Sequence, residues 1–180
     1  MPQAKRRNKE TASTAPGLNL SLRLKEGAAL ILLALSGYLL MALVSYSLQD
    51  PGWSRTKSTD QLQNIGGAVG AWLSDFVLVT IGYTGYLIPV MLGYLAFRLY
   101  QQPQTTRYEH KYLFLLKSIG CLFILISTCI LASLHFGGYQ LNLPETAGGV
   151  LGLVLAHQLT ALMEFWGASL FALTALLCGV

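Results

Sequence analysis

Four long stretches of this chain contain no lysine, arginine, aspartate or glutamate, and each is long enough to cross a bilayer or is cut off by the last residue. They run over Gly27–Gln49, Phe76–Phe97, Ser118–Pro144 and Phe165–Val180. A helix needs about 20 mostly apolar residues to cross the hydrocarbon core, where only helices or closed barrels satisfy their backbone polar groups. The stretches lack the polar alternation of barrel strands. The sequence therefore predicts an all-α membrane protein with four transmembrane helices.

The distribution of positive charge predicts the orientation. Only 11% of the residues are charged, and the formal net charge is +4. Arg55 and Lys57 lie in the first connection, whereas the other ten positive residues precede the first apolar stretch or flank the second connection. These ten are Lys5, Arg6, Arg7, Lys9, Arg23, Lys25, Arg98, Arg107, Lys111 and Lys117. Because positive residues stay cytoplasmic, we expect the N-terminus and the second connection inside. The basic arm is expected to contact anionic lipid rather than nucleic acid.

The expected organisation is a cytoplasmic basic tail over residues 1–23 and a membrane domain over residues 24–180. The predicted spans cover about 26–48, 80–100, 113–135 and 164–180. Segments 49–80 and 136–163 are each expected to form an external loop followed by an amphipathic helix, and 101–112 a cytoplasmic loop. The start of the second span is left open, because Gly82 and Gly85 could interrupt the helix or the span could begin nearer Phe76. The fourth span is expected to be truncated at Val180, as in the membrane portion of a larger protein.

The segment before the second span has a helical stripe of apolar residues that includes Ile65, Val69, Trp72 and Phe76. Its other side carries polar residues, of which Asp75 is charged. This pattern predicts a helix at the outer membrane–water interface with its polar face exposed. Asp75 is therefore either at a solvated helix end or in polar contact with a partner or a neighbouring loop. The same alternatives apply to Glu164 before the fourth span.

A glycine motif occurs twice, in the same order relative to the spans. Gly66-Gly67-Ala68-Val69-Gly70 is followed 82 residues later by Gly148-Gly149-Val150-Leu151-Gly152. The preceding spans point the same way, so the pattern predicts two parallel repeats, each with a Gly-rich amphipathic helix on the outer face. Small residues four apart let helices approach closely in lipid. That close packing could lie within the chain or between subunits.

No motif of catalysis or cofactor binding is present in the sequence. It has no GxxxxGK[ST], HExxH or GxSxG pattern, and its cysteines and histidines are not spaced as metal ligands. Cys121, Cys129 and Cys178 lie in apolar stretches, where a buried and inert thiol is expected. The spans also carry few polar residues near mid-membrane, which disfavours a transport site. We predict no catalytic, metal or cofactor residue.

Two segments resemble a known family. Ser45-Tyr46-Ser47-Leu48-Gln49-Asp50-Pro51-Gly52-Trp53-Ser54 and Asn64-Ile65-Gly66-Gly67-Ala68-Val69-Gly70-Ala71-Trp72-Leu73-Ser74-Asp75 resemble the first periplasmic region of the FtsK/SpoIIIE DNA translocases. The likeness covers most of Leu24–Val180. It implies the N-terminal membrane domain of a cell-division protein of the bacterial inner membrane, placed at the septum. In that family, the ATP-driven DNA motor and the DNA-reading domain lie beyond such a domain. No ATP or DNA residue can therefore be carried over, and this chain is not expected to be an enzyme.

The resemblance implies a set of site residues that form a structural or partner-contact surface. They are Asp50, Pro51, Trp53, Asn64, Gly66, Gly67, Gly70, Trp72 and Asp75, with Gly148, Gly149 and Gly152 of the second motif added by the repeat. The implied partners are membrane lipid, divisome proteins and further copies in a hexamer, with DNA reached only through the absent motor. The competing interpretations are a small transporter or channel subunit, and a membrane scaffold or sensor attached to another cytoplasmic domain.

Overall fold

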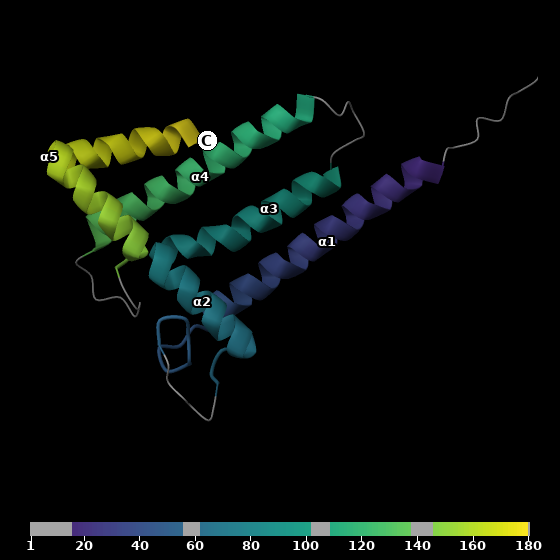
Figure 1. Cartoon of the computed structure of the whole chain (residues 1–180), viewed down its shortest axis with the longest axis horizontal. Helices are drawn as coiled ribbons and strands as arrows, with labels where there is room; N and C mark the ends of the chain where they lie inside the picture. Colours follow the sequence, from purple (N-terminus) through teal and green to yellow (C-terminus); the bar gives the residue numbers. More distant parts are fainter. Residues whose placement is uncertain (1–15, 56–61, 102–108, 138–145, 180) are drawn as a thin grey trace, which may run out of the picture.

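The computed structural model describes residues 16–55, 62–101, 109–137 and 146–179, and its regular structure there is entirely helical. Figure 1 shows the elements, which are α1 (Pro16–Val44), α2 (Gly67–Ile81), the 3-10 helix η1 (Gly82–Tyr86), α3 (Leu87–Gln101), α4 (Glu109–Phe136) and α5 (Gly149–Gly179). Four helical stretches within these ranges are long and apolar enough to cross a membrane: Arg23–Val44, Gly67–Gln101, Leu116–Phe136 and Gly149–Gly179. The prediction of an all-helical protein with four apolar spans is confirmed.

Helix α1 begins earlier than the sequence suggests. It starts at Pro16, inside the 1–23 segment that the sequence analysis assigns to the cytoplasmic tail. Proline is accepted in the first helical turn, because its fixed φ suits a helix and its missing N–H would be unpaired there anyway. No glycine or proline occurs from Leu18 to Glu26, so the helix continues into the apolar stretch without a break. The remaining tail, residues 1–15, lies outside the described residues.

The second apolar stretch is broken by η1. Gly82 has φ 62°, a conformation that residues other than glycine rarely adopt. Gly85 faces the side chain of Val77, and a Cβ at Gly85 would lie 2.5 Å from it. The helix interruption that the sequence allows at these two glycines is therefore present in the structure. Helix α3 then begins at Leu87, with Pro89 accepted in its first turn.

Helix α5 is bent at Glu164, whose φ of 57° and ψ of 176° interrupt the helix. The bend falls where the sequence analysis separates the second external helix from the fourth span. Figure 1 shows that the two halves of α5 meet at a steep angle, much as α2 meets α3. A long helix bends this sharply only where something interrupts its hydrogen-bond ladder.

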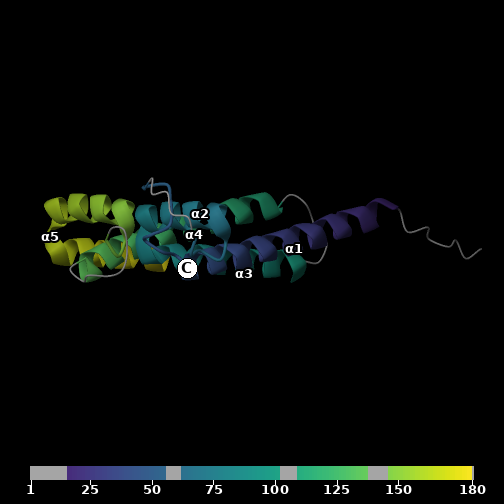
Figure 2. The same cartoon turned by 90° about the horizontal axis from the view of Figure 1, so that it is seen from below.

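The helices form two units, which we call the first unit (α1, α2, η1 and α3) and the second unit (α4 and α5). In Figure 1, α1 lies beside α3 and α4 lies beside the second half of α5. Figure 2 shows that the whole arrangement is flat and elongated. Each unit has a small core of its own, with Leu39, Leu43, Val77 and Leu78 buried in the first and Ile130, Ala156 and Ala172 in the second.

The two units meet at the break in the first one. The amide of Tyr83 donates a hydrogen bond to the carbonyl of Ala147, at 2.9 Å. Gly149 lies against the backbone of Thr80 and Gly82, where an added Cβ would be 2.5–2.6 Å from main-chain atoms. This contact joins backbone to backbone, so it requires glycine on both sides.

Candidate functional site

The connection between α1 and α2 brings three of the predicted site residues into a buried polar cluster. Asp50, Asn64 and Asp75 are only 4%, 4% and 2% exposed. Together with Tyr46 and Ser54 they form what we call the loop–helix network. Buried polar groups are costly unless they are hydrogen-bonded, and a buried charge is more costly still. The partners of these side chains therefore determine what the cluster does.

Asp50 fixes the point at which the chain returns to α2. Its two carboxylate oxygens accept hydrogen bonds from the amides of Gln63 and Asn64, each at 2.8 Å. A carboxylate that accepts backbone N–H groups makes charge-assisted bonds, which are stronger than those between neutral groups. Asp50 therefore joins the two ends of the connection, whose residues 56–61 lie outside the described part.

Asn64 joins the end of α1 to the start of α2. Its side-chain nitrogen Nδ2 donates to the carbonyl of Ala42 at 2.8 Å, which satisfies one of the last carbonyls of α1. Its side-chain oxygen accepts from the amide of Gly66 at 2.8 Å and so shapes the turn into α2. One side chain thus terminates one helix and helps to begin the next.

Asp75 holds the loop against α2. One of its oxygens accepts from the hydroxyl of Tyr46 at 2.9 Å, and the other accepts from the amide and the hydroxyl of Ser54, each at 2.7 Å. Arg55 donates to the Leu48 carbonyl at 3.0 Å and to the Tyr46 hydroxyl at 3.4 Å. Of the two alternatives for Asp75, the solvated helix end is therefore wrong. It makes a polar contact with the neighbouring loop of its own chain.

The environment of Tyr46 keeps its hydroxyl protonated. Burial raises the pKa of Tyr46 well above its ordinary value, and the hydrogen bond to Asp75 and the charge of that carboxylate raise it further. The nearby Arg55 guanidinium opposes this shift. Because the phenol is neutral at every physiological pH, it donates to Asp75 throughout that range.

Glycines make room for the network. A Cβ at Gly52 would lie 2.6 Å from the Asp75 carboxylate, and one at Gly70 would lie 2.7 Å from the side-chain oxygen of Asn64. Gly66 is also close to Asn64, and its carbonyl accepts from the hydroxyl of Tyr38 at 2.9 Å. The first glycine motif therefore packs within the chain, against α1 and against Asn64.

The outward face of α2 is aromatic rather than polar. Trp53 and Trp72 are about half exposed, at 52% and 49%, and both contact Phe76. The Trp53 ring meets Phe76 edge-on at 5.4 Å between centroids, and Trp72 stacks on it at 6.1 Å. We call these three residues the aromatic patch. The expectation that this segment exposes its polar face is wrong, because Asp75 faces the loop and the apolar stripe faces outward.

The second glycine motif lies elsewhere and makes different contacts. A Cβ at Gly152 would lie 2.5 Å from the carbonyl oxygen of Cys129, and Gly148 also packs on Cys129 and on Ser133 of α4. This motif too packs within the chain. A side chain at Gly148 or Gly152 would require α4 to move, and one at Gly149 would require the backbone of Thr80–Gly82 to move. Its three glycines are not part of the loop–helix network. Pro51 is partly buried beside the network, and Gly67 has open space around it.

Several residues of the site are not assigned to it by the sequence analysis. Tyr46, Gly52 and Ser54 all lie inside the segment that carries the resemblance, but nothing in their spacing indicates that they converge on Asp75. Phe76 was counted as one residue of an apolar stripe, although both tryptophans contact it. These contacts depend on how the loop folds back, which periodicity does not report.

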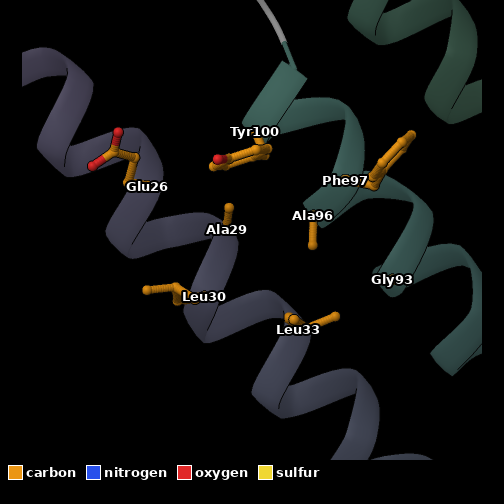
Figure 3. Close-up of a pocket in the computed structure, with 8 residues that line it drawn as sticks. All are labelled: Glu26, Ala29, Leu30, Leu33, Gly93, Ala96, Phe97 and Tyr100. Carbon is orange, nitrogen blue, oxygen red and sulfur yellow. The ribbon is translucent and has the colours of Figure 1, made fainter.

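A groove lies between α1 and α3. It has a volume of about 490 Å³ and is lined by Glu26, Ala29, Leu30, Leu33, Gly93, Ala96, Phe97 and Tyr100. Figure 3 shows Glu26 and Tyr100 near one end and Leu33 near the other. The lining between is apolar, and both helices are candidate spans, so the groove is a seam on the flank of two spans. Its chemistry suits lipid chains rather than a polar substrate.

The arrangement at the loop–helix network is suited to holding structure, not to catalysis. The oxygens of Asp50 and Asp75 are occupied by hydrogen bonds within the chain. Among the described residues, no group of three His, Cys, Asp or Glu side chains could hold a metal ion. The network fixes the loop, and the loop and α2 together present the aromatic patch.

Comparison with known proteins identifies the family that this chain resembles. A family profile described as the 4TM region of DNA translocase FtsK/SpoIIIE matches residues 21–180. The DNA translocase FtsK of Pseudomonas putida is 34% identical over 178 residues, which cover 96% of this chain and 21% of that relative. The protein of the same name from Pseudomonas aeruginosa is 32% identical over 94% of this chain, and that from Shewanella oneidensis is 32% identical over 84%. No solved structure matches significantly.

These matches cover nearly all of this chain but only the smaller part of each relative. The chain spans about a fifth of the length of the curated relatives it matches. The matched part is the four-transmembrane region and not the motor, so this chain is not the enzyme domain of the family. It is a multi-pass membrane protein, as its four apolar helices and the matched region indicate. The chain belongs to the FtsK/SpoIIIE family of DNA translocases and corresponds to its four-transmembrane region.

Proposed function

We propose that this chain anchors a DNA translocase in the bacterial inner membrane and places it at the division septum, where cell division is coordinated with chromosome segregation. The observation that carries this proposal is the family match over residues 21–180, which falls on a region with four apolar helices. ATP and DNA would be handled by the motor of the whole translocase, which acts beyond this region. No feature of the described residues favours the alternative of a transporter or channel subunit.

The septal role is tested by imaging. A fluorescent protein is fused to the N-terminus of the chain and observed in dividing bacteria that keep their own translocase. We expect a band at mid-cell, because the membrane region alone carries the placement signal in this proposal. Uniform membrane fluorescence at normal expression would contradict it.

The aromatic patch is the surface that we expect divisome partners to contact. Exposed aromatic side chains on a rigid support are typical anchors of protein interfaces. Replacing Trp72 and Phe76 by alanine should turn the mid-cell band into uniform membrane fluorescence, while Val90→Ala, at a more exposed position on α3, should leave the band unchanged. If the double variant stays septal, partners contact another surface.

We also propose that both ends of the described chain face the cytoplasm, as the ten-to-two division of positive residues indicates. Single cysteines at Ser58 and Gln104 test this in a background without the native cysteines. On intact cells, a membrane-impermeant thiol reagent should label the first position and not the second. Labelling of Gln104→Cys alone would reverse the orientation. Both positions lie outside the helices that the structure describes.

A further proposal is that the two units are parallel repeats, with α2 and the first half of α5 on the periplasmic face. The backbone supports this, since the residues with positive φ in the described ranges fall into two pairs that are each 82 residues apart. Gly67 and Gly149 have φ of 67° and 65°, and Gly82 and Glu164 have φ of 62° and 57°. The turns before the two helices also agree, with the Gly67 and Gly149 amides bonded to Asn64 and Thr146 at 2.9 Å.

A further inference from the structure

The contact between the two units shows how a helix break of this kind is covered. At the break in the first unit, the start of α5 lies against Thr80–Gly82, and Tyr83 donates to Ala147. Gly149 packs directly on this backbone: a Cβ added to Gly149 would lie 2.5–2.6 Å from main-chain atoms of Thr80, Ile81 and Gly82. Two surfaces are therefore complementary: a broken helix on one side, and the Gly-Gly start of a helix on the other.

Each of these two surfaces occurs a second time, and there it is uncovered. The second break, at Glu164, lies between Leu162 and Trp166, which are 80% and 81% exposed. The second Gly-Gly helix start is that of α2. There Ile65 is 70% exposed, and a Cβ at Gly67 would meet nothing within 4 Å. The chain thus exposes one helix break, in the second unit, and one Gly-Gly helix start, in the first unit.

We propose that a second copy of this chain covers these surfaces, so that the start of α2 in one copy docks on the Leu162–Trp166 break of the next. The proposal rests on the parallel repeat proposed above, and it names the contact by which copies of this chain would associate. The internal contact supplies the geometry. A second copy related by the same step would bring Ile65 and Gly67 against the break at Glu164, just as Ala147 and Gly149 lie against the break at Gly82 within the chain.

The two backbones must lie farther apart at this contact than at the internal one, because Glu164 stands where the first break has Gly82. A Cβ at Gly82 would collide with the carbonyl oxygen of Ala147, so Glu164 cannot be approached as closely as Gly82 is. In exchange it brings a carboxylate toward the start of α2, where the N-cap residue is Gly66, which has no side chain to cap the helix. A negative charge is favourable at a helix N-terminus, which has unpaired N–H groups and the positive end of the helix dipole. The apolar area around it is supplied by Leu162, Trp166 and Ile65.

The symmetry of this association is fixed by the repeat. Parallel repeats have the same orientation across the membrane, so a copy added by the same step also has that orientation. The contact joins two different surfaces, and is therefore heterologous rather than two-fold. Such a contact forms a ring when the rotation between copies closes. A closed ring would leave no uncovered break.

Crosslinking in membranes tests the contact. Two singly substituted chains, Ile65→Cys and Leu162→Cys, are made without the native cysteines, carry different tags and are treated with a short bismaleimide. The flexible reagent is chosen because the wider spacing would not suit a disulfide. Each variant alone should give no dimer, because like surfaces do not meet, whereas co-expression should give a dimer that carries both tags. The intramolecular pair Thr80→Cys and Ala147→Cys, at the equivalent positions, should crosslink within one chain and shows that the fold is intact.

The outcomes separate this proposal from the septal one. A dimer from either single variant alone means a two-fold contact, and absence of the mixed dimer while the intramolecular pair still crosslinks means that these surfaces do not meet. Either result overturns the proposal. Glu164→Ala should reduce the mixed dimer, and Glu164→Arg should reduce it more, because a positive charge is repelled by the helix N-terminus. Septal placement is measured on the fluorescent fusion and can hold or fail whether or not the crosslink forms.

Discussion

Asp75→Ala should release the loop over Asp50–Arg55 from α2. The substitution removes the acceptor of three hydrogen bonds and leaves the Tyr46 hydroxyl and both donors of Ser54 without their partner. Leaving buried donors unsatisfied costs about 1–3 kcal/mol, and more where the lost partner was charged. Hydrogen–deuterium exchange of the chain in lipid nanodiscs should therefore be roughly 10- to 100-fold faster in the peptide that contains Ser54.

Val69→Ala is the matched control for this prediction. Val69 lies on the same helix, but it is exposed and takes no part in the network. Its removal should leave the exchange of the loop peptide unchanged. Asp75→Asn should give an intermediate effect, since one side-chain oxygen remains as an acceptor. If the loop exchanged at the wild-type rate in Asp75→Ala, the network would not be what holds it.

The sequence was sufficient for those parts of the fold that depend on the bilayer. Long apolar stretches must form helices to satisfy their backbone polar groups in lipid. The described residues contain four helical stretches that are long and apolar enough to cross a membrane. The glycine pair at Gly82 and Gly85 likewise marks the break at η1, because only glycine readily takes the backbone conformation found at Gly82. Both features depend on the local sequence alone, so they can be predicted without knowing which helices pack against each other.

The direction in which α2 faces could not be read in this way. Periodicity separates Asp75 from Trp72 and Phe76 but does not say which side meets the protein. In water the apolar side would be buried, whereas at a membrane surface apolar side chains can face lipid. The deciding factor is the loop: Tyr46 and Ser54 reach Asp75, which turns the polar side inward. The sequence places the boundary before the fourth span at Glu164, but it does not reveal the sharp bend there, since glutamate gives no local signal for a positive φ.

Gly149→Ala should separate the two units. Alanine at φ 65° is strained by about 1–2 kcal/mol wherever it occurs, because its Cβ crowds the following carbonyl. At this position the new methyl group would also lie 2.5–2.6 Å from backbone atoms of Thr80, Ile81 and Gly82, none of which can move without the helix. Forcing extra atoms into a well-packed contact costs about a further 1–3 kcal/mol.

Cys129 reports this separation directly, and Gly67→Ala is its matched control. The Cys129 thiol is 1% exposed and lies 3.6 Å from the Ile81 carbonyl, at the contact between the units. With Cys121 and Cys178 replaced by alanine, its reaction with a maleimide in detergent-solubilised monomer should become about 5- to 100-fold faster in Gly149→Ala. Gly67 has the same φ within 2° but open space around it, so Gly67→Ala carries the strain without the collision and should leave Cys129 protected. Equal rates for the two variants would mean that backbone strain, and not the close approach of the two units, determines how firmly they are joined.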